Sequence, residues 1–146
     1  MQNGAQKVYG VDVAYGLVDL KIRNNEKVIL IERKNARYLE FANIAEKVDI
    51  IVVDVSFISL TLIIPKLIQF CKKETNIILL IKPQFELDRQ DIETGGIVRD
   101  QKLIEKAVEK IKNFSLELNL QCTGISPSKL KGQKKQNQEY FIWLKN

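Results

Sequence analysis

The strongest constraint on the fold is the run Val48–Val55 (VDIIVVDV), which is almost uniformly apolar and β-branched. A strand that is apolar on both faces is buried on both faces, which is typical of a parallel sheet covered by helices. The sequence therefore predicts an α/β fold with this run as a central strand. Other segments with strand composition are Lys7–Asp12, Val28–Ile31, Asn76–Lys82, Leu120–Ile125 and Glu139–Lys145.

Amphipathic stretches between these strands predict the covering helices. Gln101–Asn119 repeats apolar residues at helical spacing, and Asp100 stands where an N-cap residue would. Phe57–Lys73 predicts a second helix, and Gly16–Arg23 and Asn35–Glu46 predict shorter ones. Strands that alternate with helices in this way predict a doubly wound sheet.

The last connection, Ser126–Gln138, differs because it is polar and has no apolar period. Such a segment cannot pack as a crossover helix, so the last two strands should form a hairpin, with the final strand antiparallel.

Composition narrows the chemistry. The chain has no histidine, which excludes Ser-His-Asp and Cys-His catalysis and most zinc sites, and we expect no metal. Cys71 and Cys122 have no metal-ligand neighbours, so we expect free thiols in a reducing, cytoplasmic compartment. We expect no signal peptide and no membrane span. The net charge of +5 suits a polyanionic partner without requiring one.

Polar residues follow three of the predicted parallel strands, where ligands bind in open α/β sheets. They are Asp12, Asp54 and Lys82, and Glu139 begins the antiparallel final strand at the same edge. We therefore expect all four at one rim of the sheet, with carboxylates able to set the protonation state of the lysine. The alternatives are a helix cap for Asp54 and ordinary solvated strand ends for Lys82 and Glu139.

Two loops can each be interpreted in two ways. Gly95-Gly96 is either a plain turn or a mobile lip over the site. The basic loop, Lys129, Lys131, Lys134 and Lys135, is either simply solvated or an RNA contact.

Six motifs together resemble the TlyA, or hemolysin A, family of FtsJ-like ribose methyltransferases. They run in order from the first strand to the C-terminus, and DVSFISL, KPQFE and GGIVRD are specific as a set. The matching segments are Val11–Gly16, Glu32–Tyr38, Asp54–Leu60, Lys82–Glu86, Gly95–Asp100 and Asn137–Phe141.

The resemblance implies a Rossmann-like class I methyltransferase fold, a mainly parallel sheet with a C-terminal antiparallel hairpin. It also implies transfer of a methyl group from S-adenosylmethionine to a cytidine 2′-hydroxyl of ribosomal RNA, leaving S-adenosylhomocysteine. Asp54, Lys82 and Glu139 are similar to three members of the family's Lys-Asp-Lys-Glu catalytic set, with Lys82 as the general base or as the group that holds the 2′-oxygen while its proton leaves. Asp12 would bind the cofactor ribose, and Asp54 would also face the cofactor.

The same resemblance implies that residues 1–146 are one partial domain. Family members have an N-terminal RNA-binding domain, and a first strand and glycine-rich loop precede the segment equivalent to Gln2–Ala5. We expect the chain alone to be inactive and to self-associate through the gap in its sheet. Ribosomal RNA and ribosomal subunits are the expected partners.

Three alternatives differ in class from this enzyme. The chain could be a non-catalytic RNA-binding or ribosome-assembly module, as the basic loop suggests. It could be a hemolysin, as the family name suggests, although no membrane segment or disulfide framework supports a pore. A nicotinamide dehydrogenase is disfavoured because the sequence has no G-x-G-x-x-G.

Overall fold

The structure is a computed structural model that describes residues 1–130 and 137–146. The chain divides into two compact units, Met1–Glu46 and Lys47–Asn146. The assignment of residues 1–146 to one partial domain stays a prediction. Lys131, Lys134 and Lys135 of the predicted basic loop lie outside the described residues.

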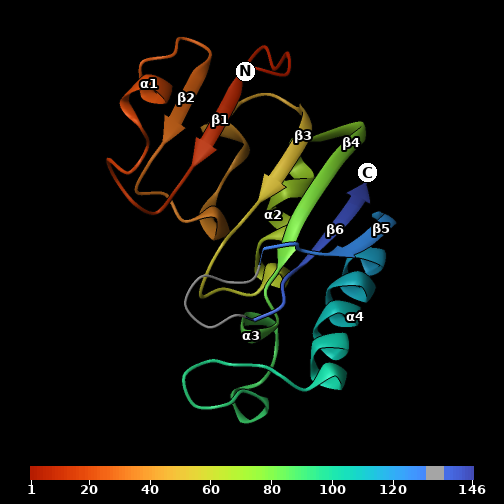
Figure 1. Cartoon of the computed structure of the whole chain (residues 1–146). Helices are drawn as coiled ribbons and strands as arrows, with labels where there is room; N and C mark the ends of the chain where they lie inside the picture. The colour runs from red at the N-terminus through yellow and green to blue at the C-terminus, as the bar shows by residue number, and fades with distance from the viewer. Residues whose placement is uncertain (131–136) are drawn as a thin grey trace. The chain divides into compact units, whose positions relative to one another are not determined.

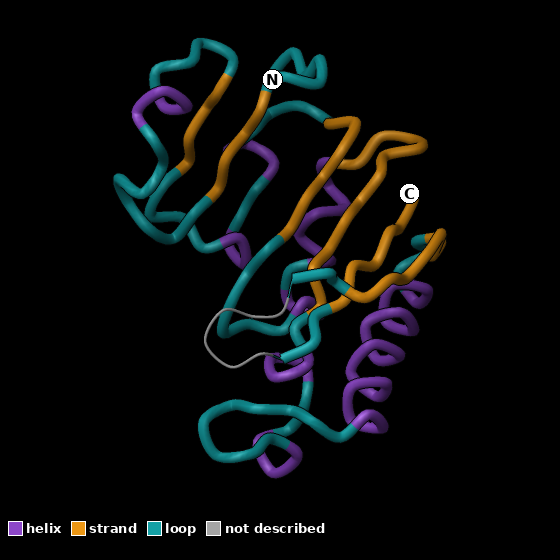
Figure 2. Tube along the Cα trace, in the orientation of Figure 1, coloured by secondary structure: helices purple, strands orange, loops and turns teal. Residues whose placement is uncertain are grey.

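The first unit contains two parallel strands side by side, β1 (Val8–Val11) and β2 (Val28–Ile31) (Figures 1 and 2). Both were predicted from the sequence, β2 with the same bounds. The side chain of Leu30 lies over Gly10 of β1. A Cβ added to Gly10 would therefore stand only 2.9 Å from Leu30 Cδ2.

The predicted helices of this unit are largely wrong. Gly16–Arg23 contributes only the single turn α1 (Leu20–Arg23), which follows the positive φ of Gly16 and the N-cap Asp19. The segment 35–46 forms two 3₁₀ turns, because Leu39 and Glu40 between them are extended. These turns are η1 (Ala36–Tyr38) and η2 (Phe41–Asn43).

The second unit is built on a four-stranded sheet in the order β3-β4-β6-β5. β3 and β4 are parallel, and β6 is antiparallel to both β4 and β5. The predicted C-terminal antiparallel hairpin is therefore confirmed. The bounds are β3 (Val48–Val53), β4 (Cys71–Ile81), β5 (Gln121–Pro127) and β6 (Tyr140–Lys145).

The long helix α4 (Gln101–Glu117) covers one face of this sheet beside β5 and β6 (Figure 1). Asp100 caps it as predicted, since its carboxylate accepts a hydrogen bond of 2.8 Å from Lys102 N. Burying the apolar stripe of this helix against the strands forms the core. Fully buried core residues include Ile77, Leu79, Ile81, Ile111, Ile142 and Leu144.

The predicted helix Phe57–Lys73 is broken into short pieces. Phe57 has a φ of 62°, which a helix cannot accommodate, and the first turn begins only after the N-cap Ser59. The segment then reaches β4 at Cys71, which leaves no room for a longer helix. The pieces are η3 (Leu60–Leu62), α2 (Ile64–Leu67) and η4 (Ile68–Phe70).

The other face of the four-stranded sheet carries exposed apolar side chains. Val52 is 70% exposed and Ile50 is 60% exposed on β3, while Phe141 and Trp143 of β6 are also exposed. Val52 and Trp143 both pair with Ile78 of β4, so the exposed residues lie on the two strands that flank β4. We call Ile50, Val52, Phe141 and Trp143 the apolar face.

Candidate active site

The carboxyl ends of β3 and β4 bring Asp54 and Lys82 together. Each residue directly follows its strand, and the two strands are parallel neighbours. Lys82 Nζ lies 2.6 Å from Asp54 Oδ1 and donates a hydrogen bond of 3.1 Å to Ser56 Oγ. The lysine side chain is only 13% exposed, whereas that of Asp54 is 66% exposed. The lysine side chain is thus largely buried, and its amine is oriented by a carboxylate that remains open to solvent.

Glu139 joins this pair because β6 runs antiparallel to β4. Tyr140, the first residue of β6, pairs with Ile81, the last residue of β4, so the flanking residues Glu139 and Lys82 stand at the same end of the sheet. Burial raises the pKa of Glu139, the charge of Lys82 opposes this, and the charge of Asp54 adds to it. The predicted catalytic residues therefore interact electrostatically, while their roles stay a prediction.

A buried glutamate braces the two loops that follow these strands. Glu86, at the end of the short helix α3 (Pro83–Glu86), is 3% exposed. Its carboxylate accepts hydrogen bonds from Leu60 N at 2.8 Å and Ser59 Oγ at 2.5 Å. Burial raises its pKa, and the hydrogen bonds and Lys110 on α4 act against that rise. The DVSFISL and KPQFE segments are therefore joined through a carboxylate.

An aromatic contact reinforces the same junction. The rings of Phe57 and Phe85 lie 5.1 Å apart between centroids, tilted by 48°. Sequence reasoning assigned no role to Ser56 or Glu86, although both lie inside quoted motifs. The available signal was their place in the sequence, Ser56 shortly after Asp54 and Glu86 shortly after Lys82, but only the paired strands show which atoms they contact.

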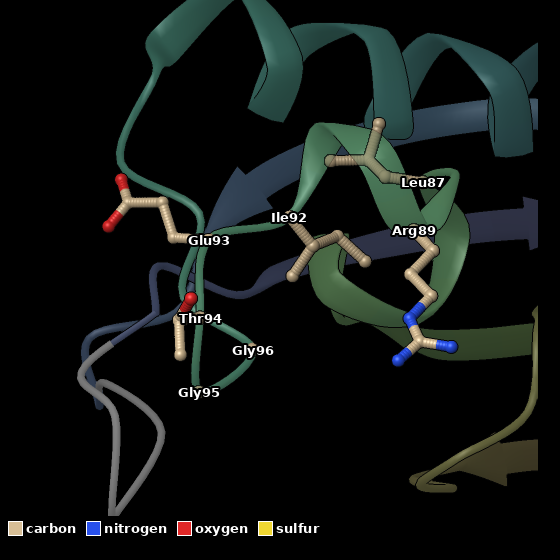
Figure 3. Close-up of a pocket in the computed structure, with 7 residues that line it drawn as sticks. All are labelled: Leu87, Arg89, Ile92, Glu93, Thr94, Gly95 and Gly96. Carbon is tan, nitrogen blue, oxygen red and sulfur yellow. The ribbon is translucent and has the colours of Figure 1, made fainter.

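The Gly95-Gly96 turn closes a short loop. Both glycines have positive φ, and Glu93 and Ile97 form an antiparallel bridge around them. η5 (Arg89–Asp91) precedes the turn, and together they line an open pocket (Figure 3). In this view the Glu93 side chain points away from Leu87 and Ile92. The pocket residues are Leu87, Arg89, Ile92, Glu93, Thr94, Gly95 and Gly96.

Asp12 lies in the first unit, at the carboxyl end of β1. Its Oδ1 accepts a hydrogen bond of 2.8 Å from Ala14 N, and its backbone is paired with Ile31 and Lys34. The carboxylate is held by its own turn and remains exposed, which suits an acceptor for the two hydroxyls of a ribose. Its predicted role in cofactor binding stays a prediction, as does its place on a common rim.

The remaining observations on the basic loop, metal ligands and membrane helices concern only the residues that the structure describes. Lys129 is exposed there, which fits either reading of the basic loop. No group of three His, Cys, Asp or Glu residues among residues 1–130 and 137–146 is arranged to hold a metal ion. Within the same residues, no helix has the length and apolarity needed to cross a membrane.

Strand order, hairpin and polar strand ends define this as a class I methyltransferase fold. The N-methyltransferase NodS of Bradyrhizobium japonicum, solved with S-adenosyl-L-homocysteine, superposes with a TM-score of 0.64. The match covers 96% of this chain and 66% of that one, at 12% identity, and so concerns the fold alone.

The chain belongs to the FtsJ-like methyltransferase family, whose pattern it matches over residues 1–146. It is 37% identical over 145 residues to the 16S/23S rRNA (cytidine-2′-O)-methyltransferase TlyA of Mycobacterium tuberculosis. It is 36% identical, with a TM-score of 0.92, to the crystal structure of a candidate hemolysin from Lactococcus lactis, covering 99% of this chain and 69% of that one. The predicted resemblance to the TlyA and hemolysin A proteins is confirmed.

The match to TlyA of M. tuberculosis covers 99% of this chain but 54% of that protein. The chain thus spans about half the length of this curated relative. What the relatives' whole proteins do is therefore carried to this chain only as a proposal.

Proposed function

We propose that this chain supplies the catalytic half of an enzyme that methylates a ribose 2′-hydroxyl of ribosomal RNA, with cytidine as the target nucleotide. The observation that carries this proposal is the sheltered Lys82 paired with Asp54 at 2.6 Å, beside Glu139, in a chain of the FtsJ-like family. Transfer of a labelled methyl group to ribosomal subunits tests the proposal.

Lys82 acts on the nucleophile. As an uncharged amine, Nζ accepts the proton of the 2′-hydroxyl while the oxygen attacks the methyl group, which makes Lys82 the general base. Asp54 and Ser56 fix the direction of the amine, because both contact Nζ. Glu139 adds a third polar group whose charge is coupled to the pair. Alignment of the attacking oxygen with the methyl group supplies much of the rate.

S-adenosylmethionine is the proposed cofactor, and when bound it supplies the methyl group and leaves as S-adenosylhomocysteine. The exposed carboxylate of Asp12 fits the two ribose hydroxyls, and Asp54 would face the methionine end. We propose that the reaction uses no metal ion. The relatives' greater length supports a further proposal, that residues outside this sequence complete the cofactor site.

The partners that we propose are ribosomal RNA and ribosomal subunits, met in the cytoplasm. The net charge of +5 favours a polyanionic partner. The same charge would suit a non-catalytic RNA-binding or assembly module, the second candidate function. Such a module would need neither Lys82 nor Glu139, so loss of function on replacing Lys82 separates the two candidates.

Replacing the four lysines of the basic loop by glutamine should weaken RNA binding. Each phosphate contact that is lost should reduce the slope of log affinity against log salt by about 1. The measurement is a salt series of RNA-binding titrations with the quadruple variant of Lys129, Lys131, Lys134 and Lys135. Two lysines on α4, the exposed Lys102 and the half-buried Lys112, replaced in the same way, serve as the control. An unchanged affinity and slope would assign the basic loop to the solvated surface.

A further inference from the structure

The GGIVRD motif has no role in the mechanism so far, yet it is firmly attached to the rest of the second unit. We call Glu93–Val98 the glycine loop. It closes on itself through Glu93 N to Ile97 O at 3.0 Å and Gly96 N to Glu93 O at 2.9 Å. Val98 at its end is buried, and Asp100 then caps α4. The loop is therefore anchored to the core at its exit.

Asn137 makes the contact that joins this loop to the end of the chain. Its Nδ2 donates to Gly96 O at 2.9 Å, and its Oδ1 accepts from Val98 N at 3.0 Å. The residue is only 3% exposed. Both ends of one buried amide are thus satisfied by the backbone of the glycine loop, which lies about 40 residues earlier in the sequence.

Asn137 stands two residues before Glu139. On the other side of this segment, Ser128 N donates to Glu139 O at 2.8 Å, and Gln138 Nε2 donates to Ser128 O at 2.9 Å. The segment that leads into β6 is therefore held from two directions, by the glycine loop and by the end of β5. Residues 137–139 themselves precede β6 and have no regular strand pairing of their own.

We infer that Asn137 is a positioning residue that fastens the glycine loop to the segment carrying Glu139, and so keeps this glutamate beside Lys82. The inference rests on the proposed function, because it assigns to the GGIVRD motif a supporting role in the same reaction. A buried amide suits this task, since losing the bond from Val98 N leaves a polar backbone group unsatisfied in the core. The glycine loop thus acts as a fixed support for the active site.

The test compares Asn137→Leu, which has a similar size and no hydrogen bonds, with Asn137→Asp, which keeps the acceptor and loses the donor. Asn113→Leu, at an exposed asparagine on α4, is the matched control. In the purified chain, Asn137→Leu should speed hydrogen exchange of the Val98 amide about tenfold while the α4 amides keep their rates. The pKa of Glu139, followed by carboxyl NMR, should fall toward its ordinary value as the loosened segment regains water.

In a longer form that also contains the part of the relatives that this chain does not cover, Asn137→Leu should lower kcat on the order of 10- to 100-fold with KM little changed. Asn137→Asp should lie between Asn137→Leu and the unchanged protein, and it serves alone if the leucine variant does not fold. Unchanged exchange at Val98, an unchanged Glu139 pKa or an unchanged kcat would each overturn the inference. If the unchanged longer form transfers no methyl group, the proposed function fails, while the Val98 and Glu139 measurements still decide the positioning.

Discussion

Lys82→Ala should reduce methyl transfer to ribosomal subunits on the order of 10²- to 10⁴-fold, the range typical of a positioned general base. The variant removes the amine that Asp54 and Ser56 contact and that we propose acts on the reacting oxygen. The assay is radiolabelled transfer by the longer form of the protein. Asp54→Ala and Glu139→Ala should also be severe, but less so, because each leaves the amine in place.

The matched control is Lys112→Ala on α4. Lys112 is also a lysine in an ion pair, at 3.1 Å from Glu109, but it lies in the middle of a surface helix. The Lys112→Ala variant should transfer methyl groups at the normal rate. Thermal unfolding of both variants should show that the fold is retained. Near-normal turnover by Lys82→Ala would contradict the mechanism, because the reaction would then proceed without this amine.

The 146-residue chain by itself should bind S-adenosylhomocysteine weakly or not at all, and should show no methyl transfer. Asp12 and Asp54 are the carboxylates that we propose for the ribose and the methionine end, and we propose that backbone groups outside this sequence hold the methionine portion. A ligand held at one end loses affinity and alignment together. Isothermal titration of the purified chain measures this, with the longer form as the positive control. Stoichiometric binding at low micromolar affinity would contradict this account of the cofactor site.

The same purified chain should self-associate. β3 is an edge strand of its sheet, and the apolar face carries Val52 and Ile50 in largely exposed positions. Unpaired strand edges and exposed apolar surface both promote association between chains. Sedimentation over a concentration series should show oligomers that Val52→Lys weakens, whereas Leu116→Lys at an exposed position on α4 should not. A monomer at every concentration would remove the proposal.

Much of the strand framework can be predicted from the sequence. Runs such as Val48–Val53 and Val28–Ile31 are β-branched and too short for helices, so local composition suffices to place them. The helix α4 and its cap Asp100 follow equally well, because a long amphipathic period combined with an N-cap is a strong local signal. The helix predicted over Phe57–Lys73 was wrong because its apolar residues pack along several short helical pieces, which give a helical pattern without one continuous helix.

The sequence by itself determined which residue types follow each strand, and hence that Asp54, Lys82 and Glu139 were candidates for one site. Strand direction alone predicts that neighbouring parallel strands end together. Only the tertiary structure decided that Ser56 orients the lysine, that Glu86 joins two motifs, and that Asn137 holds the glycine loop. The physical reason is that these contacts join residues far apart in the chain through single polar atoms. Such pairings depend on register and side-chain direction, which local patterns of hydrophobicity do not encode.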